Sequence, residues 1–234
     1  MVNPRPSPRA SRCSRTAALV LVGVVAASIA APFVGTTSSA HADPALSMIS
    51  TAVGTIGDGG SASSAYVQGG WLATDSAGNV YVPDESRIRR IDAASHIVTT
   101  VAGNGLTTSA GDGGLATDAS FRANAVAVAP NGDVYVSDYI NSNVRKIIKA
   151  TGIIVAVAGT GVSGSTGDGG QATEAQLSTP GGIALDSAGA LYIAEVGTST
   201  IRRVGTNGII STVAGTGTPG FNGNNQPALS LIHI

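Results

Sequence analysis

The sequence predicts an all-β fold made of stacked, four-stranded antiparallel sheets, the architecture of a β-propeller. One long pattern recurs along the chain: VAG, a loop ending in GDGG, an apolar strand, a strand containing tyrosine, and a strand with two adjacent basic residues. The landmarks are Asp58, Asp112 and Asp168 of the loops, then Tyr81, Tyr135 and Tyr192, then Arg89-Arg90, Arg145-Lys146 and Arg202-Arg203. Each set recurs at intervals of 54 to 57 residues, which indicates a repeat architecture.

The middle copy shows the repeating unit most clearly. Ala125–Ala129 is short and apolar, and Pro130–Asp133 carries a glycine suited to a turn, so Val134–Ser137 is expected to fold back as a hairpin. Asn143–Ile148 and Ile153–Ala158 supply a third and a fourth strand. No segment shows helical periodicity. Four short antiparallel strands per copy are typical of a propeller blade.

Counting strands predicts about three complete blades with partial copies on either side. The expected propeller covers residues 43–228, with blades at about 71–103, 125–159 and 182–215 and partial repeats at 50–60 and 216–228. Ser50–Gly54 is expected to be an outer strand that closes the ring with a last blade. Pro83 is expected to interrupt the strand before Asp84, because proline is tolerated mainly at strand edges.

The motif series also resembles a known family. The pattern VAG-T-G…GDGG-x-AT-x-AQL…P-x-GIALDSAG-x-LYIA…IRRV, read over about residues 50 to 228, resembles the NHL-repeat β-propellers of secreted bacterial proteins. The resemblance implies a six-bladed or similar closed ring. Three blades cannot close a ring, so the chain is expected to be a C-terminally truncated fragment that needs its remaining blades or a second copy.

The C-terminus supports that expectation. The fourth copy follows the pattern from Gly220 to Ala228, and Leu229–Ile234 then departs from it. The codons that would encode these last residues resemble a transposon-end adapter used in sequencing libraries. We therefore expect residues 229–234 to be a non-native tail, with a natural C-terminal strand as the alternative.

The N-terminus reads as an export signal. Four arginines precede the apolar run Ala17–Val34, and Ala40–Ala42 forms an A-x-A cleavage site, so residues 1–42 are expected to be a signal peptide. A retained membrane anchor is the alternative, because the apolar run is nearly long enough to span a bilayer. The only cysteine, Cys13, lies inside this segment, so no disulfide framework is expected. The mature protein is expected to be secreted or extracytoplasmic, with no membrane span.

The charge balance argues against nucleic acid as a partner. The chain has 13 Lys and Arg against 14 Asp and Glu, and four of the arginines lie in the predicted signal peptide. The rest is therefore acidic, whereas nucleic-acid-binding domains usually carry a basic surplus.

Six carboxylates are the candidate ligand-binding residues. Asp58, Asp112 and Asp168 lie in the GDGG loops, and Asp84, Asp138 and Glu195 end the second strand of each copy. The loop aspartates could hold a hard cation, but they lack the spaced ligands of a calcium loop, and bonding to local amides is the favoured interpretation. The strand-end acids could line a ligand funnel on one rim. The favoured alternative is that each copy needs the acid for its own turn, and the basic residues of the third strand are expected to pair with these acids or to cover the blade edge.

The sequence contains no catalytic constellation. Outside the signal and the tail, His96 is the only histidine, too few for a zinc site or a Ser-His-Asp triad. We therefore expect no catalytic residue, metal or cofactor in this part of the chain. The favoured function is a secreted, non-catalytic binding module for protein, peptide or glycan ligands. The alternatives are a hydrolase or lyase completed by further blades and a sensor domain of a larger envelope protein.

Overall fold

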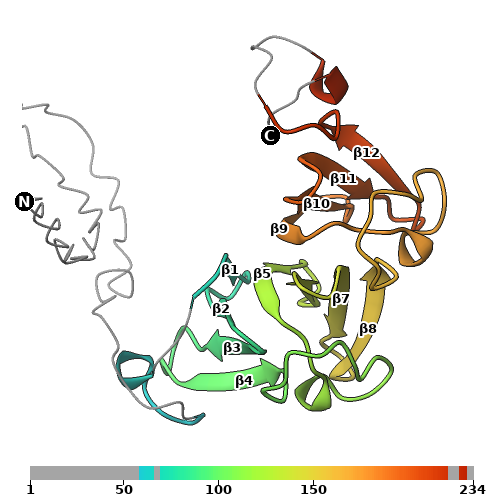
Figure 1. Ribbon diagram of the computed structural model, residues 1–234. Coiled ribbons are helices and arrows are strands. Elements are labelled where there is room, and N and C mark those ends of the chain that lie inside the picture. Colours follow the sequence, from blue (N-terminus) through green and yellow to red (C-terminus); the bar gives the residue numbers. More distant parts are fainter. Residues whose placement is uncertain (1–57, 66–68, 221–226, 231–234) are drawn as a thin grey trace, which may run out of the picture. The chain divides into compact units, whose positions relative to one another are not determined.

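The computed structural model describes residues 58–65, 69–220 and 227–230 (Figure 1). This part is all-β, with three four-stranded antiparallel sheets joined by long connections that contain single turns of 3-10 helix. The predicted fold class is confirmed. The expected signal peptide and the closing strand at Ser50–Gly54 lie outside the described residues. Within the described residues, no helix is long and apolar enough to cross a membrane.

Each sheet follows chain order, because every strand pairs with the next. The first sheet contains β1 (Ala73–Thr74), β2 (Val80–Asp84), β3 (Arg87–Ile91) and β4 (Val98–Ala102). The second contains β5 (Ala123–Val128), β6 (Val134–Asp138), β7 (Asn143–Ile148) and β8 (Ile153–Ala158). The third contains β9 (Pro180–Leu185), β10 (Leu191–Glu195), β11 (Thr200–Val204) and β12 (Ile210–Ala214).

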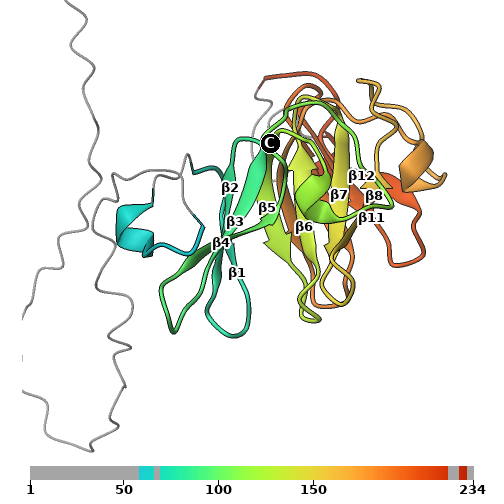
Figure 2. The ribbon, with the colours of Figure 1, turned by 90° about the horizontal axis from the view of Figure 1, so that it is seen from below.

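Antiparallel order places the turns of each sheet at two ends. The first and last hairpins of a sheet share one end, and the middle turn shares the other end with the long connections between sheets (Figure 2). We call this second end the loop end. It carries the β2–β3, β6–β7 and β10–β11 turns and the starts of β5 and β9.

The prediction that Pro83 interrupts its own strand is wrong. β2 runs through Pro83 to Asp84, and Pro83 pairs with Ile88 of β3. The shortened strand is its other neighbour, β1, which has only two residues. Pro83 has no N–H to donate, which fits the weak pairing on that side of β2.

The hydrophobic core lies between neighbouring sheets. Ile88 of the first sheet packs in one cluster with Val136 of the second, and Val144 of the second packs in another with Ile193 of the third. The connections add their own buried residues through the 3-10 turns η3 (Ala116–Asp118) and η4 (Ala172–Glu174). These residues are Ala116, Ala119 and Phe121 in the first cluster and Ala172, Ala175 and Leu177 in the second. Fully burying a large side chain such as that of Phe121 or Leu177 contributes about 1.5–3 kcal/mol.

The glycine of the VAG motif begins each connection. The N–H groups of Gly103 and Gly159 donate to the carbonyl oxygens of Ala116 and Ala172, both at 2.8 Å. Gly159 has φ +91°, and a Cβ there would collide with the carbonyl oxygen of Ser142. Glycine is therefore required both for the left-handed backbone and for the close approach of two chain segments.

Exchanging glycine for alanine at two positions separates these requirements. Gly169, with φ +82°, has no atom within 4 Å of a Cβ position, so Gly169→Ala should cost only the backbone strain of about 1–2 kcal/mol. Gly159→Ala adds the collision and should lower the free energy of unfolding by about 3 kcal/mol or more. Urea denaturation measures both. Equal losses would show that the close approach is not a constraint.

Candidate functional site

A buried arginine from the third strand is the centre of each repeat. Arg89, Arg145 and Arg202 are at most 1 % exposed and belong to β3, β7 and β11. Each forms an ion pair with the GDGG aspartate of its own repeat: Arg89 with Asp58 at 2.9 Å, Arg145 with Asp112 at 2.8 Å and Arg202 with Asp168 at 2.6 Å. The aspartates are about half exposed, so every ion pair joins a buried cation to the protein surface.

Arg145 has the fullest set of contacts. Its Nε donates to Asp112 Oδ1 at 2.9 Å, and its Nη1 and Nη2 donate to the carbonyl oxygens of Ser120 at 2.9 Å and Ala110 at 3.0 Å. The guanidinium carbon also lies 6.0 Å from the centre of the Phe121 ring. All these partners belong to the connection before β5, so Arg145 fastens the connection to the sheet that it enters. We call this arrangement the arginine clamp.

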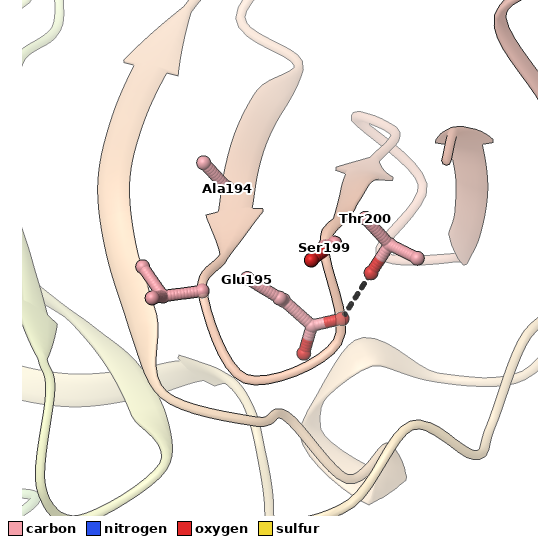
Figure 3. Close-up of a pocket in the computed structure, with 5 residues that line it drawn as sticks. Ala194, Glu195, Ser199 and Thr200 are labelled. Carbon is pink, nitrogen blue, oxygen red and sulfur yellow. Dashed lines mark hydrogen bonds between the residues drawn. The ribbon is translucent and has the colours of Figure 1, made fainter. Parts of the chain in front are cut away.

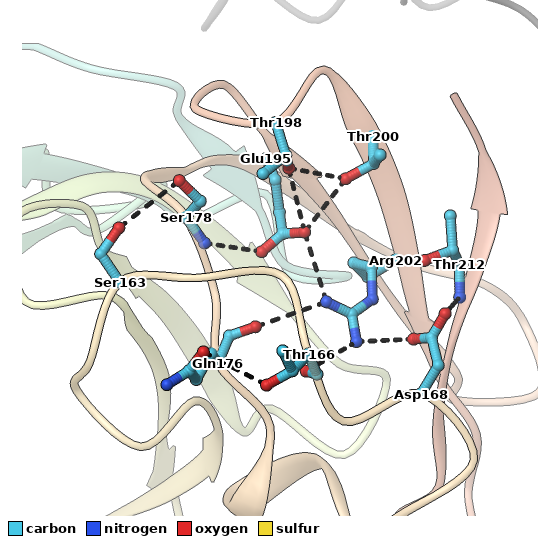
Figure 4. Close-up of polar contacts among 10 residues, drawn as sticks. All are labelled: Ser163, Thr166, Asp168, Gln176, Ser178, Glu195, Thr198, Thr200, Arg202 and Thr212. Carbon is cyan, nitrogen blue, oxygen red and sulfur yellow. Dashed lines mark hydrogen bonds and ion pairs between the residues drawn. The ribbon is translucent and has the colours of Figure 1, made fainter. Parts of the chain in front are cut away.

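Arg202 makes the corresponding clamp in the third sheet (Figure 4). Besides Asp168, it contacts Glu195 Oε2 and the carbonyl oxygen of Gln176, both at 3.4 Å. Asp168 also accepts a hydrogen bond of 2.9 Å from the N–H of Thr212 in β12. Partial burial raises the pKa of Asp168, but the hydrogen bonds from Thr212 and the charge of Arg202 outweigh it, and the net pKa lies below the usual value.

The strand-end carboxylates hold the loop end together. Glu195 is 2 % exposed and accepts hydrogen bonds from the N–H of Ser178 at 2.7 Å and from Thr200 at 3.1 Å. Asp138 is fully buried and accepts from the N–H of Arg122 at 2.9 Å and from Asn141 at 2.7 Å. Burial raises the pKa of Asp138. The third member of the set, Asp84, lies 3.5 Å from Arg89.

All six candidate carboxylates therefore make contacts within the fold. The GDGG aspartates were expected to bond to local backbone amides, but their ion-pair partners are distant in the sequence. Each of these aspartates pairs with an arginine more than thirty residues further along the chain. Pairing between third-strand arginines and strand-end acids is found for Arg89 with Asp84 and for Arg202 with Glu195. The second basic residue of each third-strand pair makes a different contact. Arg90 forms an ion pair with Asp92, and Lys146 and Arg203 each lie over a tyrosine ring.

Two cavities open at the loop end. One of about 220 Å³ lies at the β10–β11 turn and is lined by Ala194, Glu195, Val196, Ser199 and Thr200. Figure 3 shows that its carboxylate is already bonded to Thr200. The other, of about 320 Å³, is lined by Gly69, Gly70, Glu85, Arg122, Ala123 and Asn124. Sequence analysis did not identify Glu85 and Arg122, although both depart from the repeat at their positions.

Large apolar side chains are exposed in the same loops. Leu106 and Val162 follow the VAG-x-G motif of two connections, and Ile140 and Val196 lie in the β6–β7 and β10–β11 turns. These four residues, the loop-end apolar residues, are 57–61 % exposed. The side-chain amide of Asn141 donates to the carbonyl oxygen of Thr107 at 3.1 Å, which holds the segments of Ile140 and Leu106 together.

The described residues offer little material for metal chemistry. Across 58–65, 69–220 and 227–230, no group of three or more His, Cys, Asp or Glu side chains is placed to hold a metal ion. His96 is exposed in the turn between β3 and β4, with φ +57°.

Comparison with known proteins identifies the repeat. Residues 155–228 match the family model described as the teneurin NHL domain. The chain is 33 % identical to teneurin-3 of Danio rerio in an alignment of 159 positions that covers 62 % of this chain. It is 35 % identical to SUPPRESSOR OF QUENCHING 1 of Arabidopsis thaliana in an alignment of 82 positions that covers 35 % of this chain. It covers only 5 % and 8 % of the lengths of these relatives. The resemblance to NHL repeats is confirmed.

A solved structure shares the fold. A protein of unknown function from Bacteroides thetaiotaomicron matches with a TM-score of 0.56 and 22 % identity, over 71 % of this chain and 40 % of that one. Similarity at this level concerns the fold alone. A shared fold does not specify a function, which depends on the residues that each chain places on it.

The arginine clamp makes a stability prediction. Arg145→Met leaves two carbonyl oxygens and the half-exposed Asp112 without their partner and should lower the free energy of unfolding by about 2–4 kcal/mol, because each buried acceptor left unsatisfied costs about 1–3 kcal/mol. Lys146→Met on the same strand removes a cation that lies over the Tyr135 ring and should cost less than about 1 kcal/mol. Equal losses in urea denaturation would contradict the clamp.

The lowered pKa of Asp168 predicts that its contribution to folding stability is lost in acid. Its folded pKa lies below the ordinary value of 3.8, so its stabilisation is present above pH 3.8 and is lost as the pH falls through the folded pKa. The difference in melting temperature between the unchanged chain and Asp168→Asn should therefore be largest near neutral pH and shrink in acid. Glu174→Gln, which changes an exposed carboxylate outside this network, serves as the control. A difference that stays constant down to pH 2 would contradict the assignment.

Proposed function

We propose that this chain, which carries NHL repeats of the β-propeller type, is an extracytoplasmic binding module that recognises protein, peptide or glycan ligands at its loop end. One observation carries the proposal. The buried arginines and GDGG aspartates that repeat in every copy hold the connections to the sheets, whereas the loop end exposes apolar side chains and cavities. Loops positioned by a rigid scaffold are the usual location of binding residues.

The loop-end apolar residues support this role. A single exposed apolar residue is normal on a protein surface, but Leu106, Ile140, Val162 and Val196 come from consecutive repeats and share one end of the sheets. None of them belongs to the two core clusters. Apolar side chains that lose water on association contribute about 25 cal/mol per Å² of buried surface, which suits contact with a protein or a sugar face.

The outward face of the third sheet supports association with another blade. Val144 of β7 is fully buried where the third sheet covers the second, while the equivalent Ile201 of β11 is only partly buried. The N–H of Gly215 donates to the carbonyl oxygen of Ala228, as Gly159 does to Ala172, so the chain up to Ala228 follows the start of a further connection. We propose that a further blade, from remaining repeats or a second copy, covers this face.

Export is part of the proposal. The arginines, apolar run and A-x-A site of residues 1–42 support an extracytoplasmic location, and Cys13 lies within that segment. An acidic balance in the remainder disfavours nucleic acid as the ligand.

A selection experiment tests the proposal. A phage-displayed peptide library and a glycan array are screened against the chain and against a variant with Leu106, Ile140, Val162 and Val196 all changed to serine. Ligands selected by the unchanged chain should bind the variant at least about tenfold more weakly, because the apolar contact is removed. A matched variant with Leu115→Ser, an exposed leucine that pairs with the β8 edge, should bind them normally. No selected ligand, or equal binding by the serine variant, would contradict the proposal.

A further inference from the structure

The larger cavity at the loop end lies where the first sheet meets the second. Glu85 of the β2–β3 turn and Arg122, directly before β5, both line it. Both side chains are exposed, and neither forms an ion pair with any residue in the described ranges. A carboxylate and a guanidinium thus line one small cavity without neutralising each other in a direct contact.

Comparison with the other copies shows that the start of the inner strand does not require the charge of Arg122. The N–H of Tyr139 donates to the carbonyl oxygen of Arg122, and the N–H of Val196 donates to that of Thr179, both at 3.1 Å, so Arg122 and Thr179 are equivalent. Glu85 directly follows β2 as Tyr139 and Val196 follow β6 and β10. These residues are neutral. The β2–β3 turn, which has two residues between Asp84 and Arg87, is shorter than the β6–β7 turn, which has four between Asp138 and Asn143, so Glu85 lies in a turn that is particular to the first sheet. The two charges are therefore specific to this cavity.

The backbone around the two charges is held firmly. The N–H of Ala123 donates to the carbonyl oxygen of Glu85 at 2.7 Å, and the N–H of Arg122 donates to the buried Asp138 at 2.9 Å. Gly70 lies against the backbone carbonyl of Asn124, where a Cβ would collide. Both charged side chains therefore project from fixed backbone positions, so the backbone of the site need not be ordered on binding.

We propose that this cavity binds a small zwitterion of amino-acid size, with its carboxylate on Arg122 and its ammonium group on Glu85. A guanidinium presents a planar fork that matches a carboxylate, and a carboxylate accepts hydrogen bonds only, as an ammonium requires. The hollow is open to solvent, and its volume of about 320 Å³ leaves room for a molecule of this size. The inference rests on the proposed binding function and names a small ligand for the same end of the sheets.

Calorimetric titration with three probes tests the assignment. L-Alanine carries both charges, alaninamide lacks the carboxylate, and N-acetylalanine lacks the ammonium group. The unchanged chain should bind alanine at least about tenfold more tightly than either analogue. Arg122→Gln should bind alanine and alaninamide equally, and Glu85→Gln should bind alanine and N-acetylalanine equally. The controls Lys149→Gln and Glu174→Gln, exposed charges elsewhere, should behave as the unchanged chain does.

The outcomes separate this inference from the proposed function. No binding of alanine, no preference for alanine over its analogues, or unchanged selectivity in both cavity variants would overturn the zwitterion site. If peptides or glycans selected through the loop-end apolar residues still bind in that case, the proposed function stands and only the inference fails. If those ligands no longer bind while alanine still does, the zwitterion site stands and the proposed function fails.

Discussion

The rest of the structure depends on a guanidinium buried between a sheet and the connection that enters it. Burying a charge without partners is costly, so Arg145 must be surrounded by acceptors, and the connection before β5 supplies them through Asp112, Ser120 and Ala110. The same contacts fix the path of the connection, which brings Phe121 into the core between the sheets. The ion pair, the path of the connection and the packing between neighbouring sheets therefore all depend on the same contacts of Arg145.

This constraint separates structural from functional residues. A position that every copy must keep, such as Arg202 or Asp168, is used by the fold and has little freedom to serve a ligand. A position whose residue changes between copies is free to do so. Glu85 and Arg122 are charged where equivalent residues are neutral, and they meet at a cavity. Departures from the repeat, more than the repeat itself, indicate what this chain binds.

The sequence predicted the architecture well because strand and turn signals are local. Alternating residues around Tyr135 and the turn at Gly132 specify a hairpin without reference to the rest of the chain. The partners of Asp112 could not be predicted in this way, since the residue that binds it lies 33 positions later and only the folded sheet brings them together. The Glu85–Arg122 cavity has the same origin, although comparison of the copies would have marked both positions.

A double-mutant cycle on Arg145 and Asp112 tests the central claim most directly. Arg145→Met, Asp112→Asn and the double variant are compared by urea denaturation of the chain. The clamp predicts that the two changes are not additive and differ from their sum by about 1–3 kcal/mol, because either one breaks the same interaction. Additivity within about 0.5 kcal/mol would show that the two residues act independently and that the connection is held by other contacts.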